Sequence, residues 1–208
     1  MLLFLTGEIQ TGKTRWLMDA IERLRASGTE VCGVVAPGVW RKHRDNEGAV
    51  TYEKLGIDNV LLPEGKRIAF ARRRDLVEES ELASGCSQAE SAQLAWAIDD
   101  AAIAEVNAHL TRLAESTQGD APGPSPARQL LVIDELGRLE LECDQGLVSA
   151  LSLLDRGATD ALPHALVIVR RQLLETALAR FAAAPWDEHR PITASEQSLN
   201  LLLNLYET

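Results

Sequence analysis

Long apolar runs are absent from this chain of 208 residues. No segment approaches the roughly 18 consecutive apolar residues that a membrane helix requires. The apolar segment 2–5 is too short for the core of a signal peptide, and no basic segment precedes it. The sequence therefore predicts no membrane association, and the default location is the cytoplasm.

Cysteine and histidine are scarce. The three cysteines, Cys32, Cys86 and Cys143, are far apart and form no CxxC pair, and the four histidines lack metal-ligand spacing. This composition argues against a zinc site and against a disulfide framework. We expect small, buried or partly buried thiols that remain reduced in the cytoplasm.

Basic residues are outnumbered by acidic ones. Lys and Arg total 21 while Asp and Glu total 31, which gives a formal net charge of −10. Because such a surface repels phosphate backbones and anionic lipids, generic binding to nucleic acids or membranes is unexpected. The length and the 46% hydrophobic content suffice for one core, so we expect a single domain over residues 1–208.

Apolar runs of strand length alternate with helical patterns along the chain. Strands are predicted at 2–6, 31–36, 129–134, 164–170 and, more briefly, 190–193. Helices are predicted at 13–26, 88–116 (as one helix or two), about 143–156, 172–183 and 195–206, the last with Ser195 as N-cap. The alternation predicts an α/β fold with a mainly parallel, RecA-like sheet and helices on both faces.

Two segments depart from this alternation. Residues 38–75 are polar, basic and broken by glycine and proline, with alternating pieces at 49–55, 59–62 and 67–71. We interpret them as a small inserted β-ribbon. Residues 117–128 are rich in proline and glycine and predict a flexible surface loop.

One motif near the N-terminus matches the pattern GxxxxGK[ST] without departure. It consists of Gly7, Glu8, Ile9, Gln10, Thr11, Gly12, Lys13 and Thr14. The glycines allow turns in which successive backbone N–H groups point inward and bind phosphate oxygens at a helix N-terminus. Lys13 carries a positive charge to the β- and γ-phosphates, and the Thr14 hydroxyl can coordinate Mg²⁺. Because the motif follows an apolar strand and opens an amphipathic helix, we predict a P-loop that binds a nucleoside triphosphate such as ATP or GTP.

A second motif ends the predicted strand at 129–134. Four apolar residues precede Asp134, and Glu135 follows it directly. Ligands bind at the carboxyl edge of open α/β sheets, so Asp134 is a candidate Mg²⁺ ligand. Glu135 is a candidate catalytic residue that positions the attacking water, which is the main task of the protein in phosphoryl transfer.

These segments resemble a known family. Residues 130–141 are similar to the DE(I/L)G(K/R)(M/L)E signature of the small nucleoside triphosphatases also called cancer-related nucleoside triphosphatases, and residues 6–14 are similar to the start of that family. Residues 192–199 resemble its closing segment more loosely. The ribbon departs from the family pattern, because it has no Gly-Phe pair, and the loop at 117–128 looks like an addition.

The resemblance implies a RecA-like core and slow hydrolysis of several nucleoside triphosphates. It implies that Lys13 and Thr14 are phosphate and metal ligands, that Asp134 binds the metal and that Glu135 activates water. For Glu140 it implies a structural or supporting role behind the site.

Other residues have weaker claims. Arg170 and Arg171 end the third buried strand, and we favour Arg171 as a catalytic group that neutralises charge on the γ-phosphate. Trp40 and Trp186 offer rings for base stacking, but sealing the core is the preferred interpretation; Trp16 and Trp96 are predicted as core residues in helices. The ribbon concentrates positive charge, either as a solvated cluster or as a surface for a nucleotide, a nucleic acid or a protein partner. Its cations are Arg41, Lys42, His43, Arg44, Lys66, Arg67, Arg72, Arg73 and Arg74.

Three functions therefore remain open. The leading one is a Mg²⁺-dependent nucleoside triphosphatase. The second is a kinase for a nucleotide or another small molecule, although the adjacent Asp134 and Glu135 favour water as acceptor. The third is a nucleotide-dependent switch that signals to a partner through the ribbon.

Overall fold

The computed structural model describes residues 1–8, 11–44, 48–77, 96–117 and 128–206. Within these ranges the helices are α1 (Lys13–Ala26), α4 (Asp100–Ser116), α5 (Arg138–Cys143), α6 (Val148–Arg156), α7 (Leu174–Phe181) and α8 (Glu196–Asn204). The parallel strands are β1 (Leu2–Gly7), β2 (Glu30–Val35), β7 (Gln129–Leu136), β8 (His164–Arg170) and β9 (His189–Ile192). The remaining strands are β3 (Gly38–Arg44), β4 (Val50–Leu62), β5 (Lys66–Arg73) and β6 (Trp96–Ile98).

One mixed sheet contains all of these strands. Its order is β6-β5-β4-β2-β7-β8-β1-β9, and β3 pairs with β4. Strands β2, β7, β8, β1 and β9 pair in parallel, and the pairings that extend the sheet from β2 through β4 and β5 to β6 are antiparallel. Strand β8 lies between β1 and β7, so the strand that leads into the P-loop and the strand that carries Asp134 share a neighbour. The predicted α/β fold of the P-loop NTPase type is confirmed.

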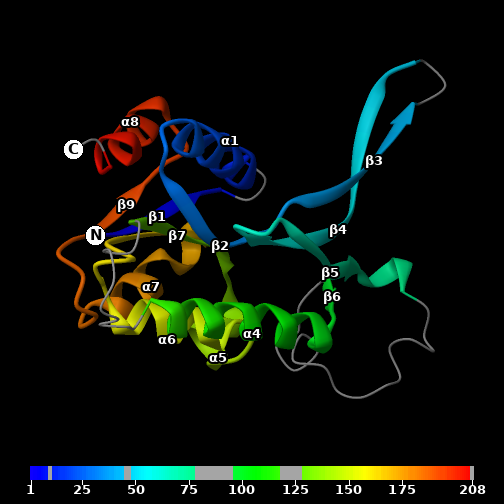
Figure 1. Cartoon of the computed structure of the whole chain (residues 1–208). Helices are drawn as coiled ribbons and strands as arrows, with labels where there is room; N and C mark the ends of the chain where they lie inside the picture. The colour runs from blue at the N-terminus through cyan, green and yellow to red at the C-terminus, as the bar shows by residue number, and fades with distance from the viewer. Residues whose placement is uncertain (9–10, 45–47, 78–95, 118–127, 207–208) are drawn as a thin grey trace.

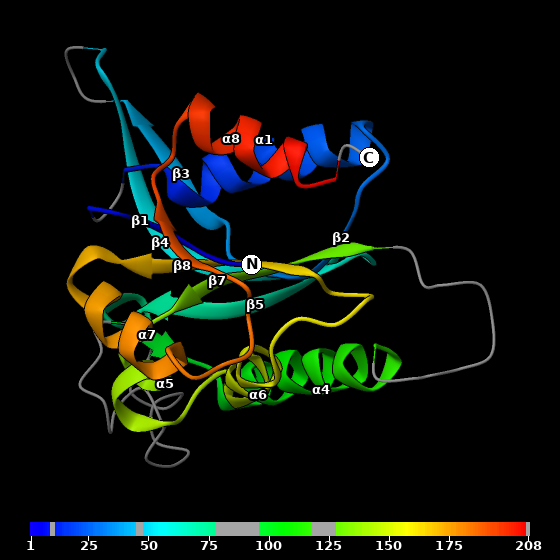
Figure 2. The same ribbon diagram turned by 90° about the vertical axis from the view of Figure 1, so that its left-hand side faces the viewer.

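Helices cover both faces of the sheet, as Figures 1 and 2 show. Helices α1 and α8 lie on one face, where Leu17 and Leu199 pack with Leu3 and Leu5 of β1. Helices α4, α5, α6 and α7 lie on the other face, where Val106 and Phe181 pack with Phe4. Because the central strands are buried on both faces, their sequences are continuously apolar rather than alternating.

The inserted ribbon is present and is continuous with the main sheet. The pieces predicted at 49–55 and 59–62 form a single long strand, β4, whose C-terminal part pairs with β2 while its N-terminal part pairs with β3. Figures 1 and 2 show β3 and the start of β4 projecting away from the two helical layers. The other end of the same strand therefore lies beside β2, which neighbours β7 in the sheet.

The prediction of helix over 88–116 is wrong for residues 96–98, and residues 88–95 lie outside the described part of the chain. Trp96 to Ile98 form strand β6, which pairs with β5. Helix α4 begins only at Asp100, because the Asp99 side chain accepts a hydrogen bond from the Ala101 N–H at 2.8 Å and caps the helix. Trp96 is consequently a half-buried strand residue and not part of a helical core stripe.

The helix predicted at about 143–156 is divided and shifted. Helix α5 ends at Cys143 because Asp144 takes a left-handed conformation with φ of 50°, and α6 starts at Val148 after Gly146 with φ of 70°. The C-terminal helix was placed correctly: the Ser195 side chain accepts a hydrogen bond from the Ser198 N–H at 3.2 Å.

Two cysteines are described, and they differ. Cys32 is buried in β2, as predicted, whereas Cys143 at the end of α5 is exposed, contrary to the prediction. Cys86 and most of the predicted loop at 117–128 lie outside the described residues. Among the helices that the structure describes, none has the length and apolar character needed to cross a membrane.

Candidate nucleotide-binding site

The P-loop motif connects β1 to α1 at the carboxyl edge of the parallel strands. Strand β1 ends at Gly7 and the helix begins at Lys13. Gly12 is the N-cap residue with φ of 84°, a left-handed conformation that a side chain would strain, and its carbonyl accepts the Trp16 N–H at 2.9 Å. Ile9 and Gln10, also predicted to bind nucleotide, lie outside the described residues.

Lys13 organises the loop. Its ammonium donates hydrogen bonds to the carbonyl oxygens of Gly7 at 3.1 Å and of Glu8 at 2.7 Å, and the residue is only 8% exposed. The Thr11 hydroxyl donates to the Glu8 carbonyl at 2.9 Å. The lysine charge is therefore held inside the loop, next to the first N–H groups of α1, where a phosphate would bind.

Asp134 is the buried acid of the site. It is 3% exposed, and its Oδ2 accepts the Ala36 N–H at 3.0 Å. Burial raises the pKa of this carboxyl from 3.8 to about 6, although hydrogen bonds from Ala36 and the Thr14 side chain act in the opposite direction. The contact with Thr14 brings the two predicted metal ligands together. A buried carboxylate is costly without a cation, so this pair fits a divalent ion.

Glu135 lies at the same edge but is partly exposed. Its Oε1 accepts a hydrogen bond from Arg170 Nε at 2.8 Å and forms an ion pair with Arg170 Nη2 at 2.8 Å. Arg171 instead pairs with Glu8 at 3.2 Å, and both of these side chains are exposed. The structure thus places both arginines at the site, with Arg170 on the candidate catalytic acid and Arg171 on the phosphate loop.

Glu140 stabilises the turn that follows β7. It is buried, and its two carboxylate oxygens accept the N–H groups of Gly137 at 2.8 Å and of Leu147 at 3.0 Å. Burial raises the pKa of Glu140. A Cβ at Gly146 would collide with Oε1 of the same carboxylate. The side chain therefore ties the turn after β7 to the start of α6.

We expect Glu140→Gln to lower the free energy of unfolding by about 1–3 kcal/mol. The glutamine amide has one acceptor oxygen, so it cannot accept from both the Gly137 and the Leu147 N–H groups through separate oxygens. Glu142→Gln is the matched control: Glu142 is exposed and, among the described residues, pairs with Arg138 alone, so its loss should be about 0.5 kcal/mol or less. Urea denaturation of both variants measures the difference. Equal losses would contradict the structural role of Glu140.

Comparison with known proteins agrees with this geometry. A family model described as NTPase matches residues 2–158, which include the P-loop, Asp134 and Glu135. The chain belongs to this NTPase family. No curated protein matches the chain.

A solved structure supports the fold of this NTPase family member over its whole length. It is the crystal structure of THEP1 from the hyperthermophile Aquifex aeolicus, which covers 100% of both chains with a TM-score of 0.59 and 16% sequence identity. At this identity the likeness concerns the fold, and the roles of individual side chains still depend on the contacts described above.

One residue at this edge is not predicted from the sequence. The side chain of Lys54, from β4, interacts electrostatically with Asp134, Glu135 and Arg170. Lys54 occurs in a polar segment whose pairing with β2 is not evident from the sequence, so no local signal pointed to the site.

The two tryptophans considered for base stacking have different environments. Trp186 is in the core and donates from Nε1 to the Leu154 carbonyl at 2.8 Å, so it seals the core as expected. Trp40 does not seal the core, because it lies on β3 with 48% of its surface exposed. A role in sealing the core is therefore wrong for Trp40.

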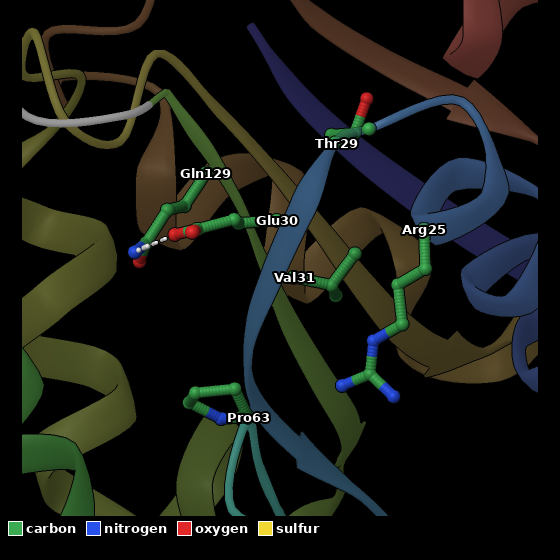
Figure 3. Close-up of a pocket in the computed structure, with 7 residues that line it drawn as sticks. Arg25, Thr29, Glu30, Val31, Pro63 and Gln129 are labelled. Carbon is green, nitrogen blue, oxygen red and sulfur yellow. Dashed lines mark hydrogen bonds between the residues drawn. The ribbon is translucent and has the colours of Figure 1, made fainter.

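A shallow pocket of about 380 Å³ lies at the opposite end of the sheet. It is lined by residues near the start of β2 and β7, among them Glu30 and Gln129, which hydrogen-bond at 2.8 Å (Figure 3). The P-loop lies beyond the other end of these strands. The pocket is therefore separate from the candidate site and offers no grouping of catalytic residues.

Proposed function

We propose that this chain is a Mg²⁺-dependent nucleoside triphosphatase that releases phosphate slowly and accepts several bases. The observation that carries the proposal is the pair Asp134 and Glu135 on β7, set beside the P-loop, with Asp134 in contact with Thr14. A metal acid followed directly by a second carboxylate suits transfer of the γ-phosphoryl group to water. The likeness to the cancer-related nucleoside triphosphatases supports the same activity.

In this proposal the backbone of residues 7–14 binds the phosphates. The Lys13 ammonium exchanges its two carbonyl partners for oxygens of the β- and γ-phosphates, which carry full negative charge and are stronger acceptors. Thr14 and Asp134 would hold Mg²⁺, which would neutralise negative charge on the β- and γ-phosphates.

Glu135 orients the attacking water and accepts its proton in the proposed reaction. The contact with Arg170 fixes the direction of the carboxylate, because the hydrogen bond from Nε and the ion pair with Nη2 both involve Oε1, and Oε2 is proposed to receive the water. Arg171 remains our candidate for neutralising the γ-phosphate, since its pairing with Glu8 keeps it on the P-loop.

A protein partner for the ribbon is a second proposal. Among the described residues, Arg41 and Arg44 of β3 have no ion-pair partner, and Val50 and Tyr52 of β4 are 41% and 64% exposed. Exposed apolar and basic groups on a projecting ribbon suit an acidic protein surface. The net charge of −10 argues against nucleic acid as the partner of the ribbon. A nucleotide-dependent switch that signals to a protein through the ribbon fits the same surface.

We also propose a cytoplasmic location for the protein.

The proposed activity is tested by phosphate release from ATP, GTP, CTP and UTP. We expect release from all four in Mg²⁺ and none in excess EDTA, and we expect Lys13→Ala to remove it, which excludes a contaminating enzyme. Tight nucleotide binding without release, in the presence of Mg²⁺, would instead favour the kinase or the switch.

A further inference from the structure

Lys54 lies at the base of the ribbon between two indole rings. Its Nζ is 6.0 Å from the ring centroid of Trp40 and 5.2 Å from that of Trp96. Trp40 is its direct cross-strand partner on β3, while Trp96 comes from β6 at the far edge of the sheet. Aromatic faces attract an ammonium and shield it from water, so these rings define where the charge is held.

The backbone after β2 links this side chain to the candidate site: the Ala36 N–H donates to Asp134 Oδ2 at 3.0 Å, and a Cβ placed on Gly38 would lie 2.9 Å from Lys54 Cε. Burial lowers the pKa of Lys54, the negative charges of Glu135 and Asp134 raise it, and the positive charge of Arg170 lowers it. Lys54 in turn lowers the pKa of Asp134. The ribbon therefore brings a further cation to the edge that already holds Lys13, Arg170 and Arg171.

This cation lacks an anionic partner. Within the described part of the chain, no carboxylate lies within 4.0 Å of Lys54, and the nearby Glu135 is paired with Arg170. Other cations of the same sheet extension are matched: Arg67 pairs with Asp58, and Lys66 pairs with Glu105. A half-buried ammonium without a counter-ion costs free energy that an anionic ligand would recover.

We propose that Lys54 is a ligand of the γ-phosphate, supplied to the active site by the ribbon. The proposal rests on the nucleoside triphosphatase function inferred above. The γ-phosphate, bound between the P-loop and Glu135, presents oxygen atoms on which charge is spread during phosphoryl transfer. Lys54 would neutralise that charge, and the two indoles would hold its side chain in place.

The test compares Lys54→Met, Lys54→Arg and the control Lys66→Met. Lys66 is a lysine at the other end of the β4–β5 hairpin, and its exposed ion pair with Glu105 leaves the site untouched. Each variant is assayed for phosphate release and for binding of ADP and of the non-hydrolysable ATP analogue AMP-PNP, both with Mg²⁺. The contrast between these nucleotides isolates the γ-phosphate.

For Lys54→Met we expect kcat to fall on the order of 10²-fold, the effect of removing one charge-stabilising donor. We also expect the affinity for AMP-PNP to fall about tenfold more than the affinity for ADP, because only the former has a γ-phosphate. Lys54→Arg should recover part of both effects, and Lys66→Met should leave both within about twofold.

The proposal is overturned if Lys54→Met is folded by circular dichroism and weakens ADP and AMP-PNP equally. Lys54 would then only hold the ribbon against the sheet. Binding measurements also separate this proposal from the proposed hydrolase activity. A wild-type chain that binds AMP-PNP but releases no phosphate contradicts the hydrolase activity. The affinity for AMP-PNP relative to ADP, compared between wild type and Lys54→Met, still decides whether Lys54 binds the γ-phosphate.

Discussion

Glu135→Gln is expected to lower kcat for phosphate release about 10³-fold while the affinity for Mg²⁺-ATP changes less than about threefold. The amide keeps the size of the side chain and can still accept from Arg170 through its oxygen, but it cannot take a proton from water. Single-turnover release of phosphate, measured beside equilibrium binding of ATP, separates the chemical step from binding.

A companion variant strengthens that experiment. Glu142→Gln makes the same chemical change on the exposed side of helix α5, where the carboxylate forms an ion pair with Arg138, so kcat should remain at the wild-type value. If Glu135→Gln hydrolysed ATP at the rate of this control, Glu135 would not be the catalytic base, and water would be positioned by another group.

Asp134→Asn is expected to lower kcat for Mg²⁺-dependent phosphate release about 10³-fold. The same substitution is expected to raise the free energy of unfolding of the metal-free protein. The variant loses the charge that fits the metal, while Asn Oδ1 can still accept the Ala36 N–H. The gain in stability comes from the buried charge that the wild type must carry at neutral pH.

The sign of this effect follows from the pKa of Asp134, which is about 6 in the folded protein against 3.8 as its ordinary value. Below pH 3.8 the carboxyl is protonated in both states and folding costs nothing extra. As the pH rises to about 6 the unfolded chain ionises first, so wild-type stability falls. Above pH 6 the deficit is constant at about 3 kcal/mol, at roughly 1.4 kcal/mol for each pKa unit.

Urea denaturation in EDTA at pH 4 and pH 7.5 measures this. The advantage of Asp134→Asn should grow by up to about 3 kcal/mol between the two pH values. Asp144→Asn is the control: its carboxylate is exposed, and asparagine tolerates the left-handed conformation at this position, so the variant should stay within about 0.5 kcal/mol. An Asp134→Asn protein that is less stable than wild type at pH 7.5 would contradict the account of a costly buried charge.

The sequence predicted those parts of the site that local patterns encode. Gly12, Lys13 and Thr14 follow a buried strand at fixed spacing, and Asp134 and Glu135 end another, so their meeting follows from the parallel sheet. The likeness of residues 130–141 to a family signature added the expectation for Glu140, whose contacts with Gly137 and Leu147 are structural.

Other parts depend on pairings that no local pattern reveals. Lys54 reaches the site only because β4 pairs antiparallel with β2, and Trp96 meets it only because residues 96–98 form a strand. Whether Arg170 or Arg171 contacts Glu135 is decided by the turn after β8, where Arg171 starts a 3₁₀ helix and points to Glu8. Such contacts join residues far apart in the sequence, so periodicity and composition do not predict them.

The most direct test of the central claim is phosphate release from Mg²⁺-ATP by the purified chain in water enriched in ¹⁸O, without any added acceptor. We predict sustained turnover with equal amounts of ADP and phosphate, one labelled oxygen in each phosphate, and no release by Lys13→Ala. ATP that stays bound and intact over many hours would contradict the claim that this site transfers a phosphoryl group to water.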